Sequence, residues 1–225
     1  KIPCSWYFML IGITYICFKI YGMKKTFLLC TLTICCMFSF AQVNLQSLVK
    51  PGTKLIYAVE ANGEKYDFII TVKALLPALV FDWQMTDDAN SNGTITHTAQ
   101  AMISANTMYN YFAPGQKTLG DDMISVWLSK NSFTGLTKTG KGIMMKMNAG
   151  ESPKKMGTYT DSKELKILVN GEKDVIEEEL VKELNDEGVP VGGEDFFTFN
   201  KSAKMPVIIR MQNGFYIALK EIKSK

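Results

Sequence analysis

The chain has all five of its cysteines before residue 42 and none from Gln42 onward. This absence excludes disulfide bonds, thiolate zinc sites and cysteine nucleophiles from residues 42–225. Histidine is almost as scarce, because His97 is the only one in the sequence. A Ser-His-Asp triad would have to use His97, and no Gly-x-Ser-x-Gly motif surrounds any serine. We therefore expect a protein that is not an enzyme.

Excess positive charge is also absent once the amino-terminal segment is set aside. Residues 1–41 contain four lysines and no acidic residue, which leaves 21 basic and 22 acidic residues in residues 42–225. Proteins bind nucleic-acid phosphates through clustered lysine and arginine, so the nearly neutral remainder predicts no nucleic-acid partner.

Residues 23–41 have the pattern of a secretory signal peptide. Lys24 and Lys25 precede a short apolar run, and Ser39 and Ala41 place small residues at positions −3 and −1 of a cleavage site. The run is shorter than the roughly 20 residues that span a bilayer, so we expect no stable membrane insertion after cleavage. The pattern predicts a secreted or periplasmic protein of a bacterial cell envelope.

Residues 1–22 contain a second apolar run and begin with lysine. We interpret this segment as sequence upstream of a true start at Met23. The alternative is a longer membrane anchor that keeps both apolar runs.

Residues 42–225 are predicted to form a single domain that is mainly β. Apolar and polar residues alternate along most of this region, and Asn-Gly pairs at 62–63, 170–171 and 213–214 favour hairpin turns. The apolar residues of the segment 99–112 fall on one helical face, and Pro114 follows them. We expect one strongly curved antiparallel sheet or a partly open β-barrel, with one covering helix at about residues 99–112.

Large aromatic side chains at alternating strand positions are candidates for the inner wall of such a barrel. They either pack the core or contact an apolar ligand. The wider set is Tyr57, Phe68, Phe81, Trp83, Trp127 and Phe215. The ligand-binding residues that we predict among them are Tyr57, Phe81, Trp83 and Trp127.

A polar segment that begins at Asp88 resembles the first part of a calcium loop. Asp88, Asn90 and Asn92 place oxygen ligands at positions 1, 3 and 5, and Thr94 supplies a backbone carbonyl at position 7. Position 12, where a bidentate glutamate is expected, is Ala99. Calcium is the one cofactor that the sequence suggests, and the alternative is a solvated turn, since Asp, Asn, Ser and Gly all favour turns.

The apolar leader, the frequent hairpin signals and the closing segments 204–208 and 215–220 resemble a group of exported bacterial β-rich proteins without an assigned function. In architecture the chain is also similar to curved-sheet periplasmic lipoprotein carriers, which hold acyl chains on a concave face. This second resemblance covers strand order alone and transfers neither a ligand nor a site.

Three functions follow as expectations, in order of preference. The first is an exported, non-enzymatic binding or carrier-like domain for an apolar small molecule. The second is a structural or interaction protein that contacts another envelope protein. The third is a hydrolase, which would need two or more acidic residues around His97 or Asp121.

Overall fold

The computed structural model describes residues 45–138, 142–202, 204 and 206–225. These residues belong to one compact unit, residues 42–225. The predicted signal peptide at 23–41 and the segment 1–22 lie outside the described residues.

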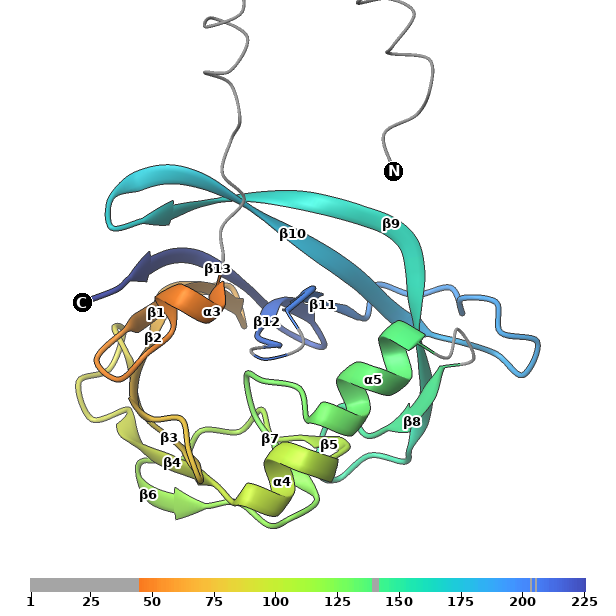
Figure 1. The fold of residues 1–225 in the computed structure, drawn as a ribbon, viewed down its shortest axis with the longest axis horizontal. Coiled ribbons are helices and arrows are strands. Elements are labelled where there is room, and N and C mark those ends of the chain that lie inside the picture. Colours follow the sequence, from red (N-terminus) through yellow and green to blue (C-terminus); the bar gives the residue numbers. More distant parts are fainter. Residues whose placement is uncertain (1–44, 139–141, 203, 205) are drawn as a thin grey trace, which may run out of the picture. The chain divides into compact units, whose positions relative to one another are not determined.

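The described region is mainly β, as the alternation predicts (Figure 1). Its strands are β1 (Lys54–Ala61), β2 (Glu64–Ala74), β3 (Leu79–Met85), β4 (Asn92–His97), β5 (Thr107–Met108), β6 (Gly115–Thr118), β7 (Met123–Ile124), β8 (Ile143–Met145), β9 (Lys154–Val169), β10 (Glu172–Glu183), β11 (Phe196–Asn200), β12 (Ile208–Gln212) and β13 (Tyr216–Lys223). Its helices are α3 (Leu45–Leu48), α4 (Ala99–Ser104) and α5 (Lys130–Lys138).

An 11-stranded sheet runs in the order β6-β4-β3-β2-β1-β13-β12-β11-β10-β9-β8. One edge of β13 pairs with β1, and the other edge pairs first with β12 and then in parallel with β9, where Ile222 faces Val169. This last pairing closes β9 to β13 into a five-stranded barrel. Strands β1 to β4 and β6 extend the sheet beyond the barrel and curve around the helices and loops (Figure 1).

Two of the predicted Asn-Gly turns are the two-residue turns of hairpins. Asn62 and Gly63 join β1 to β2 with φ of 52° and 81°, and Asn170 and Gly171 join β9 to β10 with φ of 53° and 87°. Both turn residues need φ > 0, which Asn and Gly tolerate best. The third pair differs, since Gln212 faces Tyr216 and the loop therefore has three residues.

The predicted helix over 99–112 is wrong in its extent, because α4 ends at Ser104. The Thr98 hydroxyl accepts a hydrogen bond from the Ala101 N–H at 3.0 Å and caps the start of the helix. Beyond Ala105 the chain is extended, and the Met108 N–H donates to the carbonyl of Lys146 at 2.8 Å. On the predicted helical face Ala105 and Tyr109 are buried and Met102 and Phe112 are half-buried, but tertiary pairing with β7 and Lys146 replaces the helix.

One hydrophobic core connects the sheet with α4, α5 and the segments between them. The Phe81 ring lies 5.4 Å from that of Trp127, and Phe133 of α5 packs edge-on against Phe199 at 5.6 Å. The largest side chains that are fully buried include Trp83, Trp127, Tyr57 and Phe81. The core therefore fixes the wall of the sheet against which the segments 105–112 and 123–128 lie.

Candidate functional site: an aromatic pocket

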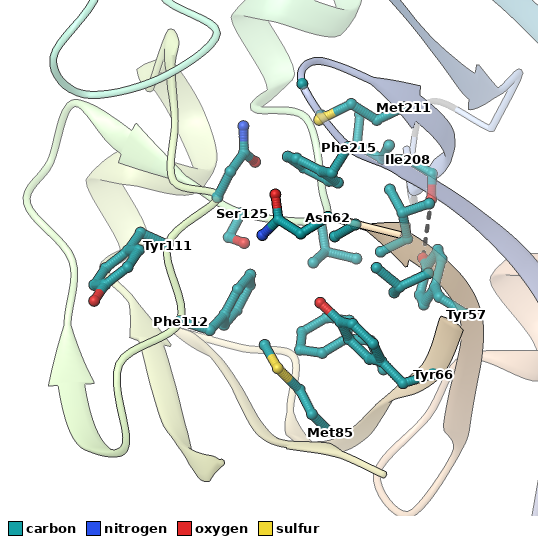
Figure 2. Close-up of a pocket in the computed structure, with 17 residues that line it drawn as sticks. Tyr57, Asn62, Tyr66, Met85, Tyr111, Phe112, Ser125, Ile208, Met211 and Phe215 are labelled. Atoms are coloured by element: carbon teal, nitrogen blue, oxygen red, sulfur yellow. Dashed lines mark hydrogen bonds between the residues drawn. The ribbon is translucent and has the colours of Figure 1, made fainter. Parts of the chain in front are cut away.

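A pocket of about 420 Å³ opens between β1–β3, β12 and β13 on one side and two non-helical segments on the other (Figure 2). Figure 2 shows Tyr111 and Phe112 across the pocket from Tyr57 and Ile208. The lining residues are Tyr57, Val59, Ala61, Asn62, Tyr66, Phe68, Met85, Asn110, Tyr111, Phe112, Ser125, Val126, Ile208, Met211, Gly214, Phe215 and Ile217.

Strand alternation explains why β1 contributes every second residue. Tyr57, Val59 and Ala61 point into the pocket, whereas Ala58 lies on the other face of the strand. The β1–β2 register places Tyr57 opposite Phe68. One face of a regular hairpin thus forms a continuous apolar wall.

Aromatic rings from separate parts of the chain meet at this wall. The Phe68 ring lies 4.6 Å from that of Phe112 and 6.4 Å from that of Tyr57, in tilted orientations. Phe112 also packs edge-on against Trp83 at 5.3 Å and against Tyr109 at 5.7 Å. Edge-on and tilted pairs are the favoured geometries of aromatic rings, so these contacts stabilise the wall.

Tyr57 is held in place by a hydrogen bond to β12, on the same side of the pocket. Its hydroxyl donates to the carbonyl oxygen of Ile208 at 2.9 Å (Figure 2). Burial raises the pKa of this phenol far above its usual range. Tyr57 therefore stays neutral and serves as wall rather than as an acid or base.

The polar groups of the lining are few and uncharged. They are the amides of Asn62 and Asn110 and the hydroxyls of Ser125 and of the lining tyrosines Tyr57, Tyr66 and Tyr111. The Asn110 amide donates to the carbonyl of Met147 at 2.7 Å, and this bond secures the segment that carries Phe112. Burial, followed by the nearby carboxylates of Asp87 and Glu64, raises the pKa of Tyr66.

Ser125 differs from the other polar groups because it is buried and unpaired. It is 1% exposed, and its Oγ has no hydrogen-bond partner among the described residues. Buried hydroxyl groups are normally bonded, so each exception requires an explanation. The hydroxyl points into the pocket (Figure 2).

The backbone around Ser125 is fixed from both sides. The Ser125 N–H donates to Nε2 of His97 at 3.0 Å, and the carbonyl of Val126 accepts from the Ile208 N–H at 2.7 Å. Val126 has φ of 63°, a conformation that a β-branched residue rarely adopts. Such strain persists only where the surroundings impose it, and it is frequent at functional sites.

His97 is a buried structural residue in this arrangement. Burial lowers the pKa of its imidazole to about 3, and Nε2 accepts the Ser125 N–H, so the ring is neutral with its proton on Nδ1. The lone pair of Nε2 is thus used by the backbone rather than by a serine hydroxyl. Asp121 lies apart from the lining and accepts a hydrogen bond from Thr98 at 2.6 Å.

Of the four predicted ligand residues, one lines the pocket and three lie in the core. Tyr57 lines the pocket, whereas Phe81, Trp83 and Trp127 are at most 2% exposed and lie outside the lining. Trp83 stands directly behind the wall, since its ring contacts those of Phe68 and Phe112. Phe68 and Phe215, which belong to the wider aromatic set, do line the pocket.

Sequence reasoning missed the residues that come from outside the regular strands. These are Asn110, Tyr111, Phe112, Ser125 and Val126, together with the turn residues Asn62 and Gly214. Phe112 carried a signal as part of the apolar pattern of 99–112, but it was assigned to a helix. No sequence pattern marked Ser125, because its position depends on the conformation of Val126 and on contacts with distant residues.

Two of the predicted calcium residues, Asp88 and Asn90, lie in the turn between β3 and β4, and Asn92 is the first residue of β4. The carboxylate of Asp88 accepts hydrogen bonds from the Asn90 N–H at 2.9 Å and from the Ser91 hydroxyl at 3.0 Å, which together lower the pKa of Asp88. The Asn92 amide donates to the carbonyl of Ala89 at 2.8 Å. The turn is held by its own bonds, and calcium binding stays a prediction.

Thr94 lies on β4, where its hydroxyl donates to Asp82 at 2.9 Å. Across the described part of the chain there is no group of three or more His, Cys, Asp or Glu residues that could hold a metal ion.

No protein-family model, curated protein or solved structure matches this chain. Within the described ranges, no helix has the length and apolar character needed to cross a membrane.

Proposed function

We propose that this protein is an exported, non-enzymatic binding or carrier-like domain whose pocket takes up an apolar small molecule. The observation that carries the proposal is the lining of the pocket, which is aromatic and aliphatic apart from a few uncharged polar groups. Small-molecule sites are typically concave and apolar, with a volume of about 300–1,000 Å³ and a small number of placed polar groups.

The chemistry of the lining supports binding rather than catalysis. None of the described lining residues is Asp, Glu, Lys, Arg or His. The one histidine of the chain is buried, neutral and bonded to a backbone N–H. General acid–base catalysis most often uses His, Asp, Glu or Lys within reach of the reacting atoms, whereas the described lining offers only tyrosine and serine hydroxyls.

The export part of the proposal rests on the sequence of residues 23–41. The excess of positive charge comes from the four lysines before residue 42, and every cysteine lies there too. Cleavage after Ala41 would release a cysteine-free protein that begins with Gln42. The mass of the secreted protein tests this part, and an intact leader on cytosolic material contradicts it.

A titration with N-phenyl-1-naphthylamine, a neutral dye that fluoresces in apolar surroundings, tests the proposed function. We expect saturable binding to the wild-type chain at one site. Ala61→Phe places a ring in the pocket and is expected to weaken binding roughly tenfold or more, because a blocked site loses the apolar area that drives binding.

Ala58→Phe is the matched control, because Ala58 lies on the same strand with its side chain on the opposite face. Both variants have the same apolar amino-terminal residues 1–41, so dye binding to that segment would not differ between them. Ala58→Phe is expected to bind the dye like the wild type. Absence of dye binding by the wild type, or equal binding by the Ala61→Phe variant, contradicts the proposal.

A further inference from the structure

We infer that the ligand of this pocket is an uncharged, ring-containing molecule with one hydroxyl or carbonyl group, and that the Ser125 hydroxyl is the hydrogen-bond partner of that group. This inference rests on the proposed function and specifies the chemistry of its ligand. Three features of the lining support it: the absence of charge, the arrangement of the aromatic rings, and the unpaired hydroxyl.

The electrostatics of the lining exclude a charged group inside the pocket. A buried carboxylate or ammonium group needs an opposite charge or several hydrogen bonds, since desolvation is otherwise too costly. None of the described lining residues carries a positive or a negative charge. An ionised ligand would therefore have to leave its charged end in solvent.

The rings of the lining favour a flat ring over a flexible chain. Tyr57, Tyr66, Phe68, Phe112 and Phe215 come from two strands, one loop and one turn and meet around the same space (Figure 2). A bound ring continues their tilted and edge-on contacts and gains more than the area that it buries. A flexible chain gains area alone and loses rotational freedom when it is ordered.

The Ser125 hydroxyl supplies the specific contact. It is 1% exposed and has no partner in the described part of the chain, so it is available to hydrogen-bond to a bound molecule. Its backbone is fixed by His97 on one side and by Ile208 on the other. The donor is thus positioned before binding, which reduces the entropy lost when a ligand hydrogen-bonds to it.

Competition against N-phenyl-1-naphthylamine by three related compounds tests this inference. Naphthalene has the ring system alone, 2-naphthol adds a hydroxyl group, and 2-naphthoate adds a charge. We expect 2-naphthol to compete best and 2-naphthoate to be at least about tenfold weaker than 2-naphthol, because its carboxylate would be buried without a partner.

Ser125→Ala removes the hydroxyl and tests its role directly. The ratio of 2-naphthol affinity to naphthalene affinity is expected to fall roughly two- to tenfold, the effect of one neutral hydrogen bond. Affinity for naphthalene is expected to stay unchanged. The variant is expected to unfold at no lower a temperature than the wild type, since Ser125 Oγ has no bond to lose among the described residues.

Ser132→Ala is the matched control. Ser132 is 3% exposed, lies on α5 outside the lining, and donates to the carbonyl of Ala105 at 2.9 Å. Its loss is expected to reduce stability and to leave the ratio of the two affinities unchanged.

The outcomes separate this inference from the proposed function. If neither the dye nor any naphthalene compound binds, the proposed function fails and the inference fails with it. If the dye and naphthalene bind but 2-naphthoate competes as well as 2-naphthol, the inference alone is overturned. The same conclusion follows if Ser125→Ala leaves the affinity ratio unchanged.

Discussion

Two neighbouring residues explain how the pocket is built at the scale of single side chains. His97 is inaccessible and neutral, and it positions Ser125 by accepting the Ser125 backbone N–H. Ser125 in turn presents a hydroxyl that the protein itself leaves unpaired among the described residues. The histidine acts as a support, and the serine is the ligand contact that we propose.

The neutral state of His97 makes stability depend on pH. Burial lowers the folded-state pKa to about 3, while the unfolded chain has a value near 6.5. Below pH 6.5 the histidine of the unfolded chain takes up a proton, whereas the buried histidine of the folded protein stays neutral down to a pH of about 3. The contribution of His97 to the free energy of unfolding is therefore fully present above pH 6.5 and is lost as the pH falls toward 3. We expect a loss of roughly 1.4 kcal/mol per pH unit in this window from this residue.

Urea unfolding of the wild type and of a His97→Gln variant between pH 7 and pH 4 measures this effect. Glutamine keeps an acceptor for the Ser125 N–H but takes up no proton. Acidic residues titrate in both proteins, so the difference between them isolates His97. Parallel pH profiles for the two proteins would contradict the buried, neutral assignment.

At the scale of elements, the sequence predicts what local physics determines. The hairpins at Asn62-Gly63 and Asn170-Gly171 were predictable because turn residues and strand alternation agree. The end of the helix that begins at Ala99 was not predictable. The apolar period of residues 99–112 matches an α-helix, but the residues after Ser104 pair with β7 and Lys146 instead. Tertiary pairing outweighed a weak local preference.

The β9–β10 turn offers a test of how much this local geometry contributes. Gly171 has φ of 87° and open space around the position that a Cβ would take. Gly171→Ala is therefore expected to cost about 1 kcal/mol through backbone conformation alone. Denaturant unfolding measures the change.

Gly150→Ala is the control for that prediction. A Cβ at Gly150 also meets open space, but its φ lies outside the left-handed range. This variant is expected to be within about 0.5 kcal/mol of the wild type or slightly more stable. Equal losses in both variants would show that the left-handed conformation at Gly171 contributes nothing.

At the scale of the whole molecule, the pocket arises where sheet curvature and non-helical segments meet. Alternation along β1 and β2 predicted Tyr57 and Phe68 as wall residues, and the structure places both in the lining. Phe81 and Trp83 share that alternation but lie in the core. They were predicted as ligand residues because a period of two does not distinguish the wall of a pocket from a packed interior.

The other half of the pocket depends on contacts between residues far apart in the sequence. Ser125 reaches the lining through bonds to His97 and through the contact of Val126 with Ile208. Local propensity contains no information about these partners. The sequence therefore predicted the sheet and one wall of the pocket, but not the residues that close it.

The most direct test of the binding claim is an experimental structure of the protein with 2-naphthol. We predict that the naphthol ring lies between Phe112 and Phe215, with its oxygen within hydrogen-bond distance of Ser125 Oγ. A pocket filled by the lining side chains themselves, or 2-naphthol bound elsewhere on the protein, would contradict it.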